Sequence, residues 1–248
     1  MTEDLTTARA PPTLRVAELI TLGRTLPVPF LLHLVDEGGS PIELRCREVL
    51  RLLPGRRLVA LCIQEGEPRI LKLFMGSSAT RYRNRERAGV LALARCGVPT
   101  PALLGAPEDP AGVGGGLLFE YLDGAHPVAE GDGEAIDQIA ALLGKLHTSG
   151  VWHGDLHLDN FVKDSTGKVH AIDGDGIRGL RKHGHRPLSE RASLENLALL
   201  LAQLPPLADA RLQAPLESYD AARGCSALPL ARMGAMTRWH RRLRARHY

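Results

Sequence analysis

Hydrophobic positions in the first third of the chain come in short runs that polar turns separate. Four β-compatible runs, VPFLLHLV, IELRCREVLRLL, RRLVALCI and RILKLF, are divided by DEGGSP, PG and QEGEP. Short apolar runs bounded by Gly, Pro, Asp and Ser favour strands joined by tight turns. The pattern therefore predicts an antiparallel, meander-like sheet over residues 28–74. Helical spacing in TLRVAELITLG predicts a helix before the sheet, and residues 1–13 are expected to form a flexible tail.

The rest of the chain is dominated by a helical period. SATRYRNRERAGVLALARCG predicts a helix that Gly97 closes, and EAIDQIAALLGKLHTSG predicts a second helix with one apolar face. GGGLLFEYLDG predicts a strand, NFVKDSTGKVHAIDGDG a hairpin, and SLENLALLLAQL a helix that Ser193 opens. These elements predict an α+β, bilobal fold with an antiparallel-sheet N-lobe (14–119) and a minimal helical C-lobe (120–248).

Composition supports two packed lobes and shows one strongly charged segment. The chain has 248 residues, of which 44% are hydrophobic, so each lobe has enough apolar side chains for a core. The net charge is only +3, but the C-terminal segment TRWHRRLRARHY contains five arginines and no acid. Such a run predicts an anionic partner, either a phosphorylated glycolipid or an anionic membrane surface; a solvated helix is the alternative. Nucleic acid is not expected, because no recognition motif accompanies the charge.

Cysteine usage and hydropathy bear on the compartment. Cys46, Cys62, Cys96 and Cys225 show neither CxxC nor zinc-finger spacing, and the first three lie among apolar residues. They are expected to be free thiols in a reducing compartment. The N-terminal residues are polar, and no run approaches the ~20 apolar residues that span a bilayer. A cytoplasmic location is expected, with peripheral contact at the inner face of the inner membrane as a further expectation.

The stretch WHGDLHLDNFV, residues 152–162, concentrates ligand-type side chains between apolar ones. One interpretation is a metal centre, because His153 and His157 are four residues apart and GDLH resembles the first motif of dinuclear metallophosphoesterases. The later motifs of those enzymes are absent from the sequence. Gly154 also favours an irregular loop over a helix that would bring the two histidines together.

A second interpretation of this stretch uses its distance from the following hairpin. Asn160 comes five residues after Asp155, and Asp173 comes thirteen residues later, at the end of the apolar run VHAID. This is the spacing of a phosphoryl-transfer site of the protein-kinase type. Asp155 is the candidate to orient an attacking hydroxyl and accept its proton, and Asn160 and Asp173 are candidate Mg²⁺ ligands. His153 is expected to fix the loop.

Upstream residues complete the predicted site. Lys72 lies in the apolar strand RILKLF, where an unpaired charge would be costly, and is the candidate to bind the ATP phosphates. Glu86, the only acid between Lys72 and Glu108, is its candidate partner. In LLFEYLDG, the backbone of Glu120, Tyr121 and Leu122 is the candidate adenine-binding segment, where Glu120 to Asp123 would join the lobes.

These motifs together resemble one family, the lipopolysaccharide core heptose and Kdo kinases of Gram-negative bacteria. The resemblance runs from about Cys46 to Leu204 and rests on ILKLF, RERAGVLALARCGVPTP, LLGKLHTSGVWHGDLHLDNFV and VHAIDGDGIR. It implies a protein-kinase-like fold, ATP and Mg²⁺ as cofactors, and transfer of the γ-phosphate to a sugar hydroxyl of the lipopolysaccharide inner core. It also implies that the basic run 178–186 and the C-terminal arginines hold the anionic acceptor or the membrane surface.

The sequence departs from the protein-kinase pattern at several positions. The predicted phosphate-covering hairpin keeps only Gly55, with Arg56 and Arg57 available to bind phosphate. Asp173 begins an Asp-Gly-Asp sequence in place of Asp-Phe-Gly. No peptide-docking segment is evident after it. A nucleotide-binding pseudokinase that serves as a scaffold in envelope assembly, and an atypical RIO-like protein kinase, are therefore alternative interpretations.

Overall fold

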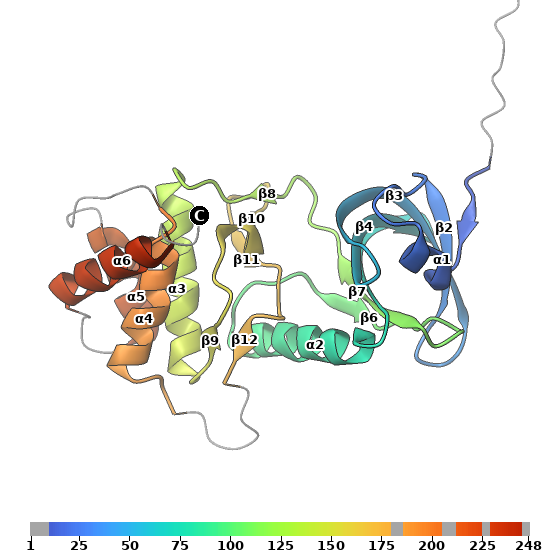
Figure 1. Cartoon of the computed structure of the whole chain (residues 1–248). Helices are drawn as coiled ribbons and strands as arrows, with labels where there is room; N and C mark the ends of the chain where they lie inside the picture. Colours follow the sequence, from blue (N-terminus) through green and yellow to red (C-terminus); the bar gives the residue numbers. More distant parts are fainter. Residues whose placement is uncertain (1–9, 180–185, 205–211, 225–228, 245–248) are drawn as a thin grey trace, which may run out of the picture. The chain divides into compact units, whose positions relative to one another are not determined.

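The computed structural model describes residues 10–179, 186–204, 212–224 and 229–244. The chain divides into two compact units (Figure 1). Unit 1 consists of residues 1–84 and 102–121, and unit 2 of residues 85–101 and 122–248. The division falls within helix α2 (Ala79–Arg95), so residues 85–101, which the sequence analysis assigns to the first lobe, belong to unit 2.

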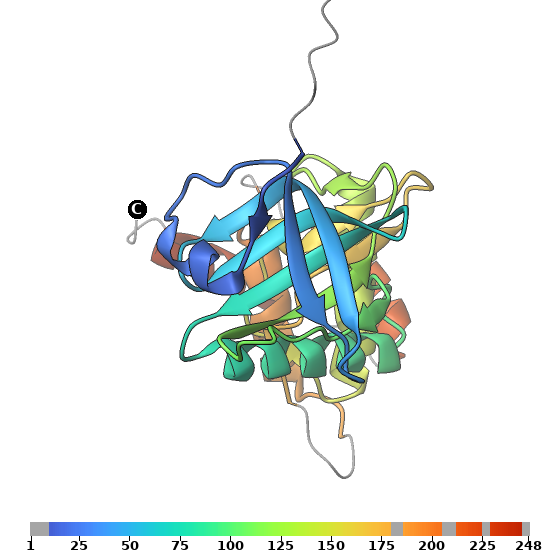
Figure 2. The same ribbon diagram turned by 90° about the vertical axis from the view of Figure 1, so that its right-hand side faces the viewer.

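Unit 1 is built on a seven-stranded sheet in the order β1-β2-β3-β4-β5-β7-β6. Every pairing is antiparallel except that of β1 with β2. The strands are β1 (Thr13–Leu14), β2 (Phe30–Val35), β3 (Pro41–Leu53), β4 (Arg57–Gln64), β5 (Glu67–Met75), β6 (Leu103–Gly105) and β7 (Gly114–Glu120). The predicted meander is therefore confirmed as β2 to β5. Figure 2 shows these strands side by side, in blue to cyan.

The N-terminal part of unit 1 differs from the expectation in two respects. The predicted first helix forms as the short α1 (Val16–Thr21). Pro12 accepts a hydrogen bond from the Leu31 amide, and Thr13 pairs with Leu31 in the sheet. These two residues, assigned to the tail from the sequence, are thus part of the fold because the edge of β2 satisfies their backbone groups. Residues 1–9 of the predicted tail lie outside the described residues.

Alternating side chains on the strands of unit 1 build its core. On β5, Leu71 and Leu73 are buried in this core, and Lys72 between them points to the other face. Cys46 and Cys62 are register partners on β3 and β4, both fully buried, with their sulfur atoms 3.1 Å apart. The hydrogen bond to Cys62 and burial raise the pKa of the Cys46 thiol, so both behave as small apolar residues.

Unit 2 combines helices with two small antiparallel sheets. The helices, besides the C-terminal part of α2, are α3 (Gly133–Thr148), η1 (Leu158–Asn160), α4 (Glu190–Leu201), α5 (Gln213–Arg223) and α6 (Leu230–Arg244). One sheet has the order β11-β10-β8 and the other pairs β12 with β9. The strands are β8 (His126–Pro127), β9 (Trp152–His153), β10 (Phe161–Lys163), β11 (Val169–Ala171) and β12 (Ile177–Arg178). The predicted hairpin is confirmed as β10 and β11.

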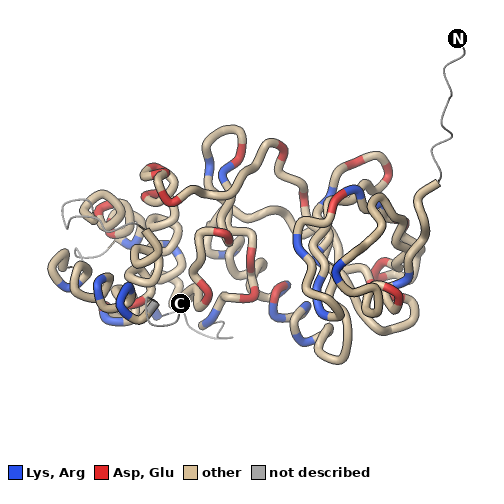
Figure 3. The backbone as a smooth tube through the Cα atoms, turned by 45° about the horizontal axis from the view of Figure 1, so that its top comes forward, with Lys and Arg blue, Asp and Glu red and all other residues tan. Residues whose placement is uncertain are grey.

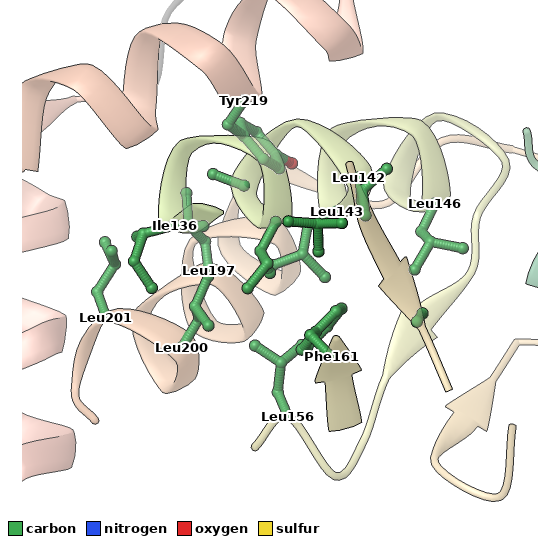
Figure 4. Packing of buried hydrophobic residues seen from close by; sticks show 14 of the residues in the cluster. Ile136, Leu142, Leu143, Leu146, Leu156, Phe161, Leu197, Leu200, Leu201 and Tyr219 are labelled. Atoms are coloured by element: carbon green, nitrogen blue, oxygen red, sulfur yellow. The ribbon is translucent and has the colours of Figure 1, made fainter. Parts of the chain in front are cut away.

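The core of unit 2 lies between α3, α4, α5 and the strands that carry the candidate catalytic loop (Figure 4). Leu143 and Leu197 meet there, and Phe161 lies among the same apolar side chains at the start of β10. α4 begins earlier than predicted, because the Ser189 side chain caps it by accepting from the Ala192 amide. Ser193, the predicted cap, is buried inside the helix.

Within the described residues, no helix is both long and apolar enough to cross a bilayer.

Candidate active site

The candidate catalytic loop connects β9 to β10, and its side chains alternate between the interior and solvent. Leu156, Leu158 and Asn160 are buried, whereas Asp155 and His157 are exposed. The Asp155 side chain is 63% exposed and forms a 3.3 Å contact with the His157 ring. The crowded stretch is thus a loop anchored by apolar residues, with its carboxylate presented to solvent.

Asn160 connects this loop to the strand that carries Asp173. Its side-chain Nδ2 donates to the Asp155 carbonyl at 2.7 Å, and its backbone carbonyl accepts from the Ile172 amide at 2.9 Å. Because Nδ2 is committed to Asp155, the other end of the carboxamide, the oxygen, faces away from that bond. An amide oxygen and a carboxylate on adjoining segments are donors that Mg²⁺ accepts, so Asn160 and Asp173 fit the predicted ligand roles.

Asp173 begins a tight turn whose backbone amides bind a side chain of α2. The Asp173 carboxylate accepts from the Asp175 amide at 2.9 Å. Glu86, fully buried on α2, accepts from the amides of Gly174 at 3.2 Å and Asp175 at 2.9 Å. The pairing of Glu86 with Lys72 stays a prediction; within unit 2, the Glu86 carboxylate binds the backbone of the Asp-Gly-Asp turn.

His153 lies beneath the same turn. Burial lowers its pKa, while the Asp173 and Asp155 carboxylates and the Asp173 backbone oppose that effect. A β-carbon at Gly176 would lie 2.6 Å from the His153 ring, so this approach requires glycine. The Gly154 amide, next to His153 in the chain, donates to the Gly176 carbonyl at 2.7 Å. This bond connects the catalytic loop to the segment that follows the Asp-Gly-Asp turn.

A buried polar network holds the start of the catalytic loop from below. Asn196 of α4 donates from Nδ2 to the His153 carbonyl at 2.8 Å, and its Oδ1 accepts from the His153 amide at 3.3 Å. The same Oδ1 is 3.0 Å from Nε2 of His147, and Nδ1 of His147 is 2.7 Å from the Tyr219 hydroxyl.

The donors and acceptors of this network determine which ring nitrogen of His147 carries the proton. Since Oδ1 of Asn196 only accepts, Nε2 of His147 must carry a proton, and in the neutral ring Nδ1 must accept from Tyr219. Burial lowers the pKa of His147 to about 4, against an opposing hydrogen bond to Asn196. Near neutral pH the ring is uncharged, and both ring nitrogens of His147 have a hydrogen-bond partner.

Gln203 supports the middle of the loop. Its Oε1 accepts from the Leu158 amide at 3.3 Å, and its Nε2 donates to the Leu156 carbonyl. Gln203 follows α4, so α4 and the residues just after it supply two carboxamides that bind the loop backbone.

Unit 1 carries the predicted phosphate-binding residues. Lys72 lies in β5, an interior strand of the sheet, paired with Val59 and Leu117, and its ammonium group is 5.3 Å from the centre of the Phe119 ring. Gly55 and Arg56 form the turn between β3 and β4, where Gly55 has a φ of +66°. The predicted hairpin therefore exists, with glycine at the position that needs a left-handed backbone.

The predicted adenine-binding segment begins at Glu120, the last residue of β7. The Glu120 amide donates to the Ala102 carbonyl at 2.9 Å, and the Glu120 side chain accepts from the Ala102 amide at 3.2 Å. The Leu122 carbonyl accepts from Ala125 at 3.2 Å. Two of the backbone groups offered for adenine, the Glu120 amide and the Leu122 carbonyl, are thus used within the chain.

The metal-centre interpretation finds no support in this arrangement. His153 is buried and His157 is exposed, so the two rings face different environments. Across the part of the chain that the structure describes, no cluster of three or more His, Cys, Asp or Glu side chains could hold a metal ion.

Unit 2 therefore brings together Asp155, His153, Asn160, Asp173 and Glu86, and it also contains Leu122. The other predicted site residues belong to unit 1: Gly55, Arg56, Lys72, Glu120 and Tyr121. Sequence reasoning missed Asn196, His147 and Gln203. The signal available for Asn196 was an amide within the apolar run SLENLALLLAQL, where a buried polar side chain needs a partner.

Comparison with known proteins supports the fold. No protein-family model matches the chain. It is 28% identical over 145 residues to the probable bifunctional tRNA threonylcarbamoyladenosine biosynthesis protein of Methanosarcina acetivorans. That match covers 51% of this chain and 25% of the relative, so the chain spans about a quarter of the relative's length.

Two solved structures resemble the chain along most of its length. Vaccinia related kinase 3 has a TM-score of 0.50 with 13% identity, covering 92% of this chain and 94% of that one. The specific rhoptry antigen kinase domain of Toxoplasma gondii has a TM-score of 0.52 with 14% identity, covering 95% and 92%. The chain has a protein-kinase-like α+β fold.

Proposed function

We propose that the protein is an ATP-dependent phosphotransferase whose acceptor is a sugar hydroxyl of the lipopolysaccharide inner core. The observation that carries the phosphotransferase assignment is the pair of bonds by which Asn160 binds the Asp155 carbonyl and the amide of Ile172, the residue before Asp173. This arrangement presents an exposed carboxylate beside two oxygen donors for a cation, as phosphoryl transfer requires. The acceptor assignment rests on the resemblance of VHAIDGDGIR and the other motifs to the core kinases.

Each residue has a role that follows from its chemistry. Asp155 orients the acceptor hydroxyl and takes its proton while the oxygen bonds to the γ-phosphorus and the bond to the ADP oxygen breaks. Asn160 and Asp173 would hold Mg²⁺, which neutralises charge on the phosphates when bound. Lys72 would bind the phosphates, with Arg56 at the β3–β4 turn as a further contact.

The short connection after Asp173 favours a small acceptor. Only residues 174–189 separate Asp173 from α4. β12 lies in this segment and pairs with β9, which precedes the catalytic loop. A peptide substrate needs an extended docking surface, and this segment offers little length for one. A sugar presents one hydroxyl and needs few contacts to be positioned.

Phosphate transfer to purified inner-core acceptors is the test of this proposal. Asp155→Asn should lower kcat by about 10²- to 10⁴-fold, because the general base is lost while its shape is kept. Asp159→Asn, an exposed acid in the same loop, is the matched control and should retain activity.

Thermal unfolding with ATP and Mg²⁺ separates binding from transfer. At 100 times its dissociation constant, the nucleotide should stabilise the wild type and Asp155→Asn by about 2.7 kcal/mol, and Asp173→Ala should lose this effect. Stabilisation without transfer to any acceptor would instead favour the pseudokinase scaffold. No stabilisation of the wild type would contradict the proposal as a whole.

The partial likeness to a tRNA threonylcarbamoyladenosine biosynthesis protein supports a second candidate, an atypical kinase that acts in tRNA modification. This candidate predicts a protein hydroxyl as acceptor. Autophosphorylation that depends on Asp155, in the absence of any transfer to glycan, would favour it over the sugar kinase.

We also propose that α6 contacts an anionic membrane surface. The exposed residues of α6 recur at helical spacing and include no acid: Ala231, Arg232, Ala235, Arg238, Trp239 and Arg242. Trp239 is 52% exposed, and Figure 3 marks the arginines of this helix in blue. Arginines flanking an exposed tryptophan suit a lipid interface, where the ring enters the headgroup layer and the cations face phosphate.

Other basic residues predicted to bind an anion are committed elsewhere. Arg241 faces inward, donates to the Leu201 carbonyl at 3.2 Å, and has its pKa lowered by burial. Arg178 donates to the carbonyls of Asp175 and Ile177. Residues 180–185 and 245–248 lie outside the described residues. The candidate surface is therefore the outward side of α6.

A further inference from the structure

We propose that Asp175 and Arg85 are positioning residues that lock the Asp173 turn onto α2, and that Asp175 is not itself a magnesium ligand. This inference rests on the proposed function of Asp173. The sequence leaves Asp175 open to two roles, as a second acid beside the metal or as a solvated side chain. The contacts of unit 2 indicate a third role.

The Asp175 carboxylate is engaged by a guanidinium group in a paired, two-bond geometry. Nη2 of Arg85 donates to Oδ2 at 2.6 Å, and Nε of Arg85 donates to Oδ1. The backbone carbonyl of Asp175 also accepts from Arg178 at 2.6 Å. Both carboxylate oxygens are therefore held by one arginine of α2, the arrangement in which an arginine fixes orientation as well as charge.

The neighbouring glycines allow the turn to lie directly on the helix backbone. A β-carbon at Gly89 would overlap the Gly174 carbonyl, and one at Gly174 would lie 2.6 Å from the Val90 amide nitrogen. Both glycines are thus required for this contact. At Gly174, where protein kinases carry phenylalanine, any side chain would push the turn away from α2.

The three devices act on successive residues of one turn. Glu86 binds the amides of Gly174 and Asp175, and Arg85 binds the Asp175 side chain. The missing side chain at Gly89 lets the Gly174 backbone pack directly on the helix. The Asp175 amide also donates to the Asp173 carboxylate, so displacement of Asp175 would release the predicted metal ligand. The ion pair is the accessible part of the lock, since its side chains are 42% and 26% exposed.

Backbone hydrogen exchange without nucleotide or metal tests the lock directly. Arg85→Gln and Asp175→Asn should each speed exchange of the Gly174 and Asp175 amides, because the ion pair that holds the turn is lost. Arg95→Gln, which removes the same charge from the exposed last turn of α2, should leave those amides unchanged. Because exposed ion pairs add little to global stability, the variants should remain folded.

The Mg²⁺ dependence of nucleotide binding separates positioning from ligation. Both variants should raise the Mg²⁺ concentration for half-saturation about tenfold, as loss of residues that orient metal ligands does. Loss of a positive charge alone would strengthen cation binding, so weaker binding in Arg85→Gln is diagnostic of lost positioning. The exchanged pair R85D/D175R should restore tight binding, and G89A should weaken it where G133A, whose β-carbon meets no neighbour, does not.

Two results would overturn the inference. Unchanged amide exchange in Arg85→Gln and Asp175→Asn would show that the ion pair holds nothing. Weaker Mg²⁺ binding in Asp175→Asn but not in Arg85→Gln would make Asp175 a direct ligand. If the wild type binds no Mg²⁺·ATP, the proposed function fails, and the exchange experiment still decides whether the lock exists.

Discussion

Asn196 is the residue through which the interior of unit 2 controls the catalytic loop. Its carboxamide binds both the amide and the carbonyl of His153, two residues before Asp155. These are buried backbone groups, and leaving one without a partner costs about 1–3 kcal/mol. His147 contacts the Asn196 carboxamide in turn, and Tyr219 contacts His147, so the loop is connected to one buried imidazole.

The stability of the protein should therefore fall in acid through His147. Its pKa is about 4 in the folded protein against an ordinary value of 6.5, so the unfolded chain binds the proton more tightly. The contribution is fully present above pH 6.5, and it is lost progressively as the pH falls towards 4. The pKa difference corresponds to about 3 kcal/mol.

Denaturant unfolding at pH 7 and pH 4.5 measures this contribution by comparison with variants. His147→Gln should be less stable than the wild type at pH 7, and its stability should fall less between the two pH values, because it has no proton to take up. His33→Gln, which removes an exposed histidine that contacts Glu43, is the control and should keep the wild-type pH dependence. An equal pH dependence in His147→Gln would show that the imidazole is not held neutral.

Residue-level prediction has its firmest basis where the chemistry is local in the sequence. Asp155, Asn160 and Asp173 are recognisable because a hairpin fixes their separation, and the loop and hairpin both form. The partners of the loop are distant: Asn196 is 43 residues from His153, and Arg85 is 90 residues from Asp175. Nothing in the local pattern identifies these contacts, because a carboxamide or an arginine on a helix has many equally suitable partners.

At the scale of elements, α3 and α5 pack closely against each other at Gly144. A β-carbon at Gly144 would lie 2.6 Å from the Tyr219 carbonyl and 3.0 Å from the Ala222 side chain. The hydroxyl of Tyr219 binds His147, so the packing of α5 against Gly144 also positions one member of the polar network. Glycine in a helix costs about 1 kcal/mol relative to alanine, and this packing offsets that cost.

Gly144→Ala should accordingly destabilise the protein although alanine is the better helix former. Overpacking of this kind costs about 1–3 kcal/mol, which exceeds the gain in helix propensity. Chemical denaturation measures the change. Gly133→Ala, at the first position of the same helix with no neighbour near the added carbon, should be neutral or stabilising. A gain in stability for Gly144→Ala would mean that α3 and α5 lie further apart.

Elements were predictable where turn chemistry and periodicity agree. The β2–β5 meander and α3 are bounded by glycine, proline or a capping acid, and they form where expected. α4 was placed late because Ser193 and Ser189 both suit a cap, and only the tertiary structure shows that Ser193 is interior. β1 was missed because a two-residue strand has no period of its own, and its pairing with β2 decides it.

At the scale of the whole molecule, positive and negative charges nearly balance, but the outward side of α6 carries arginines and no acid. Three exposed arginines and Trp239 share one side of this helix, and Met233, Thr237 and His240 are buried on the other. Arg232 contacts Glu190 at 2.6 Å, and Arg238 and Arg242 are the two other exposed arginines of this side. Each basic residue near such a surface contributes about 1 kcal/mol.

The double variant R238Q/R242Q should therefore bind vesicles of anionic phospholipid about 30-fold more weakly than the wild type, which corresponds to about 2 kcal/mol. Co-sedimentation at fixed salt measures this change, and Trp239→Ala should weaken binding further because the ring no longer enters the headgroup layer. R47Q/R51Q removes the same charge from exposed positions on β3. This control distinguishes binding through the surface of α6 from binding that depends only on the net charge of the protein. If both double variants lose affinity equally, attraction is non-specific; if the wild type prefers RNA to the vesicles, the partner of α6 is a nucleic acid.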